Sequence, residues 1–321
     1  MPDSSPWDEI TTPGADFNVR QVSAKTAVPC FWGRDAFGRC LFVIELAGDF
    51  TSRFRADFVR VRGIEIDLRE ERAGTQRLVL RLEKQVDRDL FEGLCHTLAR
   101  ALVRACDAAS ALAVALAHVR RWKRFLSGNT QRLSPDQVRG LYAELTFLLE
   151  LLDGRLPPAN ATDAWRGPDR SQHDFVFGDS AVEIKSLAGT ERNAVRISSE
   201  DQLESLNDNL FLRIYRLSDI TGAHASRSLN GIIEAVRELL ADADAADAFD
   251  RKLAACGYAP LPEYDEPRYI VSEMRTYLVR SGFPRLVRPM LPTGIFRVSY
   301  DLALEAIDAF KCAGSQVFGE L

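Results

Sequence analysis

The sequence lacks the features of a membrane-spanning or secreted chain. No uninterrupted apolar run approaches the roughly 20 residues that a helix needs to cross a bilayer. The first six residues, MPDSSP, contain neither the basic nor the apolar region of a signal peptide. We therefore expect a cytoplasmic protein that does not bind membranes.

Cysteine and histidine are few, and nucleotide-binding motifs are missing. The six cysteines show no CxxC spacing, and none lies near a histidine pair suited to zinc, so we expect reduced core thiols. The chain contains no Walker P-loop, no GxGxxG motif and no internal repeat. These absences argue against a zinc site and against a protein that drives translocation by itself.

The net charge of −5 argues against a protein that simply coats DNA, because lysine and arginine carry phosphate binding. Basic residues nevertheless gather in two intervals, one just before residue 139 and one between residues 268 and 297. Either interval could contact DNA phosphates or form a solvated face, and the sequence leaves both interpretations open. The first interval supplies four candidate DNA contacts: Arg120, Arg121, Lys123 and Arg124.

The pattern of the first 126 residues predicts an N-terminal α+β domain with a mainly antiparallel sheet. We expect irregular structure up to Pro29, a hairpin formed by 30–32 and 39–46, and strands at 58–66 and 77–82. From residue 87 to about 125 the apolar residues recur with a helical period. No catalytic pattern occurs here, so docking to a target or partner is the role we expect for residues 1–126.

Two short alternating runs, His173–Phe177 and Ala181–Ser186, flank a Gly-Asp-Ser turn and predict a β-hairpin. Successive side chains point to opposite faces of a sheet, so Glu183 and Lys185 share one face of the second strand. With the apolar residues in the core, Asp174 can join them in one polar patch.

Two neighbouring carboxylates repel each other unless a cation or a basic group compensates them. A magnesium ion in such a patch can polarise a phosphodiester and activate water, while Lys185 offsets the charge on the phosphate. This pattern indicates metal-dependent phosphodiester hydrolysis. In the alternative interpretation, Glu183 and Lys185 are solvated residues on an edge strand and Asp174 caps a turn.

A helix is predicted from Ser134 to about residue 152. Ser134 suits the N-cap, Pro135 the first helical position, and Gln137 completes a capping box. At about 100° per residue, Glu144 falls on the flank of the apolar stripe and needs a partner. That partner is either a metal site or a boundary salt bridge.

These motifs resemble the PD-(D/E)XK nuclease superfamily, in particular the bacterial proteins named for that motif and associated with phage defence. The resemblance covers the Ser134–Pro135 cap, Gly140–Leu145, Asp163–Pro168, the His173–Ser186 hairpin and Gln202–Leu203. It is strongest over residues 130–217. His173 stands where the superfamily has proline.

The resemblance implies a restriction-endonuclease-like αβββαβ core within residues 127–225. Its strands would include 194–197 and 210–217, with a helix beginning at a capping box over 199–202. It also implies roles for particular residues. Asp174, Glu183 and the Ile184 carbonyl would hold Mg²⁺ or Mn²⁺, Lys185 would orient the attacking water, and Glu144 would be an auxiliary ligand or base.

Gln202 has two interpretations, a helix cap or a contact to DNA or the metal-bound water. Residues 226–321 predict a C-terminal α/β extension packed on the core. Its helix begins at Ser228, strands follow at 269–279 and 294–300, and a closing helix covers 302–310.

The sequence therefore predicts a metal-dependent DNA endonuclease of restriction type in bacterial anti-phage defence. We expect DNA as its substrate, with other defence proteins and a second copy of the chain as further partners. The alternative is a non-catalytic adaptor that retains the nuclease fold and binds nucleic acid or protein within a defence complex.

Overall fold

The computed structural model describes residues 5–23, 26–83, 88–127, 132–169, 171–189, 193–204, 207, 209–219, 225–240 and 242–319. The chain forms two compact units. The first comprises residues 1–131 and 257–262, and the second comprises 132–256 and 263–321. The second unit contains most of the predicted nuclease core and most of the predicted C-terminal extension, while residues 127–131 and 257–262 belong to the first unit. The mixture of helices and sheets confirms the α+β class.

The first unit contains a five-stranded sheet of order β1-β2-β3-β5-β4, in which every neighbouring pair is antiparallel, as predicted. β3 is the middle strand of this order, and most of its side chains are buried. The expectation of irregular structure before Pro29 was wrong, since β1 pairs with β2 there. The strands are β1 (Phe17–Gln21), β2 (Cys30–Asp35), β3 (Cys40–Ala47), β4 (Ile64–Arg72) and β5 (Thr75–Leu82).

Three helices complete the part of this unit that the structure describes. The leucine-rich stretch that predicted helical structure forms α2, which buries Leu94, Leu98 and Leu102 on one face. The strand predicted at 58–66 starts later than expected, because β4 begins only at Ile64, and a short helix ends at Asp57 just before the predicted strand. The helices are α1 (Thr51–Asp57), α2 (Arg88–Leu102) and α3 (Ala108–Ser127).

The second unit is built on a sheet of order β12-β10-β9-β7-β6. β7 and β9 are parallel, and the other neighbouring pairs are antiparallel. The strand predicted at 269–279 is therefore part of the same sheet as the hairpin. The strands are β6 (Phe175–Phe177), β7 (Ser180–Ala188), β9 (Asn209–Asp219), β10 (Tyr269–Leu278) and β12 (Lys311–Cys312).

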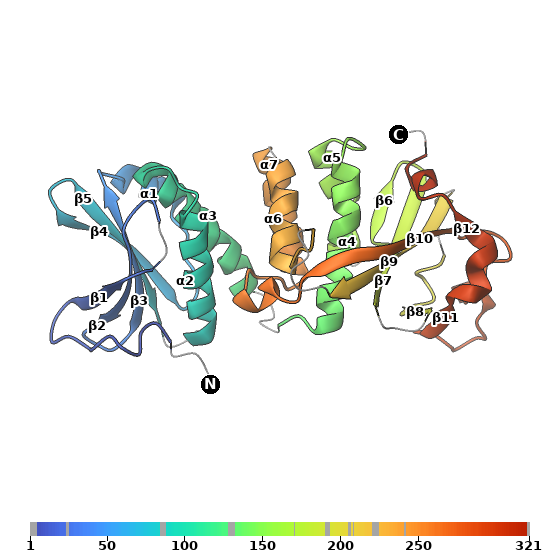
Figure 1. The fold of residues 1–321 in the computed structure, drawn as a ribbon, viewed down its shortest axis with the longest axis horizontal. Coiled ribbons are helices and arrows are strands. Elements are labelled where there is room, and N and C mark those ends of the chain that lie inside the picture. Colours follow the sequence, from blue (N-terminus) through green and yellow to red (C-terminus); the bar gives the residue numbers. More distant parts are fainter. Residues whose placement is uncertain are drawn as a thin grey trace. The chain divides into compact units, whose positions relative to one another are not determined.

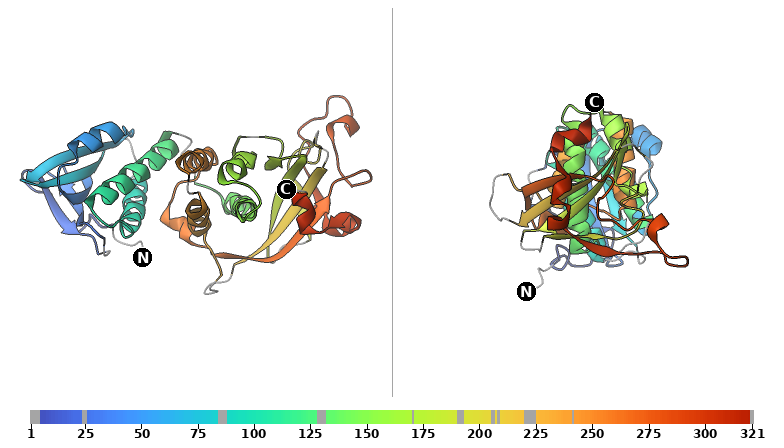
Figure 2. Two further views of the ribbon diagram at one scale, coloured as in Figure 1. Left: turned by 90° about the horizontal axis from the view of Figure 1, so that it is seen from above. Right: turned by 90° about the vertical axis from the view of Figure 1, so that its right-hand side faces the viewer.

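Four helices lie on one side of this sheet (Figures 1 and 2). α4 packs against β7, while α6 packs on α4 and α7 packs on α5. The capping box of Ser134 and Gln137 is present, and Ser228 caps α6, both as predicted. The helices are α4 (Pro135–Leu152), α5 (Pro158–Ala164), α6 (Leu229–Leu239) and α7 (Ala243–Ala255).

Two predicted elements of the core and one of the C-terminal extension need correction. β8 (Ala194–Ile197) does not join the main sheet but pairs with β11 (Tyr300–Ala303) in a separate two-stranded sheet. Residues 200–203 form a turn where we predicted a helix, and residues 205, 206 and 208 lie outside the described part. The predicted closing helix is instead the end of β11 followed by a 3₁₀ segment, Leu304–Phe310.

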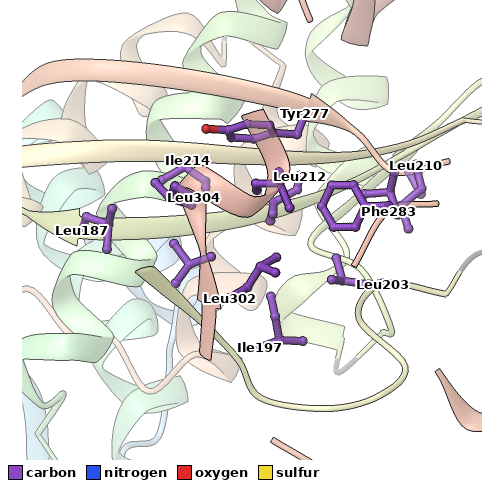
Figure 3. Close-up of a cluster of buried hydrophobic side chains, with 14 residues drawn as sticks. Leu187, Ile197, Leu203, Leu210, Leu212, Ile214, Tyr277, Phe283, Leu302 and Leu304 are labelled. Carbon is purple, nitrogen blue, oxygen red and sulfur yellow. The ribbon is translucent and has the colours of Figure 1, made fainter. Parts of the chain in front are cut away.

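The second face of the main sheet is covered by this small sheet and the 3₁₀ segment. Side chains of β7, β9 and β10 meet those of β8 and β11 in one buried apolar cluster (Figure 3). Ala181 and Leu187 of β7 belong to this cluster and are nearly inaccessible to solvent. The central strands are therefore buried on both faces, which explains why β9 reads as an almost continuous apolar run.

Within the part of the chain that the structure describes, every helix falls short of the length and hydrophobicity required to cross a bilayer.

Candidate active site

The hairpin of β6 and β7 brings Asp174 beside β7. Phe175 pairs with Val182, so Asp174 lies at the entry to the hairpin, next to the middle of β7. Its Oδ2 atom accepts a hydrogen bond from the Ile184 backbone N–H at 2.7 Å. Gly178 has a positive φ of 50°, which permits the tight turn between the two short strands. The turn and the alternation of the strands fix this register.

Glu183 and Lys185 lie on one face of β7, as the alternation predicted. The Lys185 Nζ is 2.7 Å from the Glu183 Oε1 and donates a second hydrogen bond, 3.1 Å long, to Gln202 Oε1. The same oxygen of Gln202 accepts from the Ser198 N–H. Gln202 thus contacts the lysine and does not cap a described helix.

The structure contradicts the alternative of solvated residues on an edge strand. β7 lies between β6 and β9. Glu183 is 1 % exposed, and its neighbours along the same face, Ala181 and Leu187, belong to the apolar cluster. A carboxylate in such a position is costly unless it is paired, protonated or bound to a cation.

Glu144 of α4 lies near the same region, where it contacts the loop that follows α5. The indole Nε1 of Trp165 donates a 2.7 Å hydrogen bond to Glu144 Oε2. Gly167 follows in this loop, and a Cβ atom placed there would lie 2.8 Å from Glu144 Oε2 and 3.2 Å from Asp174 Oδ1. Both carboxylates therefore face the space beside Gly167.

Burial is the main cause of the unusual acidities in this cluster. It raises the pKa of Glu144 well above its ordinary value, and the charge of Asp174 raises it further. It also raises the pKa of Asp174, against the opposing effect of Lys185. Burial and the Asp174 charge together raise the pKa of Glu183 from 4.5 to about 8. Three carboxyl groups and one ammonium group leave this site short of positive charge.

The donor chemistry of the cluster fits a hard divalent cation, because Mg²⁺ prefers carboxylate oxygens. As the side chains lie, however, no three Asp, Glu, His or Cys residues of the described ranges are arranged to hold a metal ion. Lys185 contacts one oxygen of Glu183, and the Ile184 N–H contacts one oxygen of Asp174. Metal binding would therefore require these carboxylates to reorient.

The predicted basic residues belong to the first unit, whereas the cluster belongs to the second. Arg120 and Lys123 belong to α3 in the first unit, and Arg120 lies 3.6 Å from Asp57 of that unit. Arg121 is on the same helix. The side chain of Arg124 lies outside the described part. Their contact with DNA stays a prediction.

Three residues at the cluster were not among the predicted site residues. Trp165 and Gly167 hold and shape the position of Glu144, and the Trp-Arg-Gly-Pro motif was the signal for them. Lys252 of α7 donates to the Trp165 carbonyl and to Asp169 Oδ2, so it ties α7 to this loop. Lys252 gave no local signal, because its partners lie more than 80 residues earlier in the chain.

His173 replaces the proline of the superfamily motif as a buried side chain. It is 5 % exposed, and burial lowers its pKa, which favours the neutral imidazole.

Comparison with known proteins identifies a family but no close relative. No curated protein and no solved structure matches the chain. A family model described as "Putative PD-(D/E)XK family member, (DUF4420)" matches residues 4–305. Families of this superfamily indicate a nuclease-like fold, a nucleic-acid substrate and the general use of divalent metals. The chain belongs to this PD-(D/E)XK family, as the hairpin motif predicted.

Proposed function

We propose that the chain is a metal-dependent endonuclease that hydrolyses phosphodiester bonds in DNA. The observation that carries this proposal is the convergence of Asp174, which precedes β6, with Glu183 and Lys185 of the buried strand β7, while Glu144 approaches from α4. A purely structural cluster would not need three carboxyl groups with raised pKa values beside a single lysine.

Asp174 and Glu183 would hold the cation, with Glu144 and the Ile184 carbonyl as further candidate ligands. When bound, Mg²⁺ or Mn²⁺ lowers the pKa of water and offsets the charge on the phosphate. Lys185 would leave Glu183 and turn its ammonium group toward the attacking water or the phosphate oxygens. Gln202 would hold that lysine in place, since it already accepts a hydrogen bond from it.

The restriction-endonuclease-like architecture is part of this proposal. Its support is α4 packed against β7, the β6–β7 hairpin, and the parallel pairing of β7 with β9. The second core helix of the expected αβββαβ order has no counterpart in the described residues 199–204. The proposal therefore rests on the hairpin, α4 and β9.

Cleavage assays with purified protein test the proposal. Wild type should nick or cut plasmid DNA with Mg²⁺ or Mn²⁺, and Asp174→Asn, Glu183→Gln and Lys185→Met should each lower the rate by about 10²-fold or more. Asp179→Asn and Lys311→Met are matched controls, because both residues are exposed and lie on the hairpin turn and on β12. Equal inactivity of wild type and variants on DNA and RNA would refute the proposal.

The second candidate is a non-catalytic adaptor that keeps the fold. It is favoured by the ion pair between Lys185 and Glu183, because the lysine already occupies one oxygen of the carboxylate that would bind a metal. Calorimetry separates the two candidates. A nuclease should bind Mn²⁺, and Glu183→Gln should weaken that binding at least tenfold, whereas an adaptor need not bind the metal.

The resemblance to phage-defence proteins extends the proposal to a restriction-type role. Bacteria that express the wild-type chain with its neighbouring genes should resist phage, and Lys185→Met should remove that resistance. Resistance that is unchanged by Lys185→Met would favour the adaptor.

A further inference from the structure

One segment of the second unit concentrates positive charge in a chain of negative net charge. Between Glu273 and Asp301 the sequence contains five arginines and no acidic residue. Three of these arginines, Arg285, Arg288 and Arg297, lie in residues 284–299, which we call the arginine loop. Figure 2 shows this loop, in orange, extending away from the main sheet of its unit.

The arginine loop also exposes large apolar side chains. Phe296 is 70 % exposed, Met290 is 62 % exposed and Ile295 is 52 % exposed. The Arg297 guanidinium lies 6.0 Å from the centre of the Phe296 ring. An exposed phenylalanine beside an arginine, with no acidic residue nearby in the sequence, suits a ligand that offers both phosphates and flat apolar bases.

Hydrogen bonds tie the loop to the turn that carries Gln202. The buried Glu200 accepts from the backbone N–H groups of Arg297 and Val298 at 3.1 and 2.8 Å. Arg288, whose side chain is 71 % exposed, lies 3.2 Å from Asp201. Arg285 donates to the Leu203 carbonyl.

The same turn reaches the candidate active site. Gln202 accepts from Lys185 Nζ at 3.1 Å, so only one short turn separates the arginine loop from the catalytic lysine. A nucleic acid whose phosphate lies at Lys185 would therefore pass beside the loop.

We infer that the arginine loop grips duplex DNA next to the cleavage site, with Arg288 and Arg297 on phosphates and Phe296 inserted against a base step. This inference rests on the proposed nuclease function. Apolar wedges of this kind unstack base pairs and bend the duplex, and the flanking arginines hold the backbone on either side. Insertion at the loop would fix the register of the strand that enters the active site.

Binding without divalent metal tests the loop separately from cleavage. The probe is a fluorescein-labelled duplex of mixed sequence, and fluorescence anisotropy gives its affinity over a series of salt concentrations. Phe296→Ala should weaken binding about tenfold at every salt concentration. Arg288→Ala and Arg297→Ala should each reduce the slope of log affinity against log salt by about 1.

Controls and outcomes are distinct. Phe37→Ala and Arg72→Ala replace an exposed phenylalanine and an exposed arginine of the first unit and should leave the affinity unchanged. Loop variants that bind as wild type does, a wild type that binds no duplex, or loop-dependent binding to RNA alone would overturn the inference. If DNA binding depends on the loop but no cleavage occurs, the role of the loop is supported and the nuclease function is refuted. If the protein cleaves DNA but the loop variants bind as wild type does, the nuclease function is supported and the role of the loop is refuted.

Discussion

Trp165 holds Glu144 through a single hydrogen bond of 2.7 Å between the indole Nε1 and the carboxylate Oε2. This bond links the loop after α5 to the helix that faces the hairpin. Among the hydrogen bonds of the described residues, it is the one that fixes the direction of the Glu144 side chain toward Asp174.

Replacing Trp165 with phenylalanine keeps an aromatic side chain, although a smaller one, and removes the indole N–H donor. A buried carboxylate without its partner costs about 1–3 kcal/mol, so Trp165→Phe should lower the free energy of unfolding by that amount. Urea denaturation measures it. In a Glu144→Met background the same change should cost much less, because no acceptor remains. An equal cost in both backgrounds would assign the loss to packing alone.

Gly167→Ala should impair cleavage while the fold persists. The added methyl group would lie 2.8 Å from Glu144 Oε2 and must displace that side chain from Asp174. A displacement of this size reduces turnover by about 10²-fold when a carboxylate takes part in the reaction. Cleavage rates and circular dichroism check the prediction.

Gly140→Ala is the matched control. Gly140 lies inside α4, and a Cβ atom there meets nothing within 4 Å. This variant should be more stable than wild type by roughly 0.5–1 kcal/mol, because alanine suits a helix interior better than glycine does. Its cleavage rate should stay at the wild-type level. A similar loss of cleavage rate in both variants would contradict the specific role of Gly167 at the carboxylates.

Stability without metal should fall as the pH rises from about 4.5 to about 8. In this range the folded state keeps a proton on Glu183, whose pKa is raised to about 8 by burial, while the unfolded state has released it. The folded state thus binds more protons, and the free energy of unfolding decreases with pH.

The Glu183→Gln variant should lose the Glu183 part of this dependence and keep the part due to Glu144 and Asp174, whose pKa values are also raised. Its stability relative to wild type should be greater at pH 8 than at pH 5, as measured by urea denaturation at both values. Mn²⁺ should bind wild type more tightly as the pH rises, because the metal competes with the proton. Parallel stability curves for wild type and Glu183→Gln would contradict the raised pKa.

Arg213 should be a large contributor to the stability of the second unit. This β9 arginine is 1 % exposed, pairs with Glu150 of α4 and donates to Tyr215 and to the Gly314 carbonyl. Arg213→Met would remove this ion pair and leave Glu150, which is partly exposed, with the Tyr215 hydroxyl as its donor, so it should cost about 1–3 kcal/mol. Arg155→Met, which removes an exposed arginine of the same unit, should change the melting temperature little. Equal effects would contradict the prediction.

Local patterns in the sequence predicted the parts of the fold that depend on local contacts. The hairpin, the Ser134 capping box and the helix after Ser228 each rest on residues a few positions apart, and each is present. Asp174, Glu183 and Lys185 could be brought together because a tight turn and a period of two fix their relative positions.

The elements that were missed depend on partners far away in the chain. β8 has only four residues and pairs with β11 about a hundred positions later, so nothing local assigns it to the small sheet. β1 is an edge strand with mostly exposed side chains, which hides its alternation. The burial of Glu183 could not be predicted from the sequence either. The face of β7 that carries it is covered by β11 and the 3₁₀ segment that follows, which are far away in the chain.

The position of β10 in the chain has a consequence for incomplete molecules. β10 pairs with one edge of β9, yet it is synthesised only after α6 and α7. A fragment that ends before Tyr269 would present the unpaired N–H and C=O groups of a long apolar strand to any neighbour. Such edges recruit strands from other molecules, so stalled translation or proteolysis between α7 and β10 should yield aggregates and not a smaller working protein.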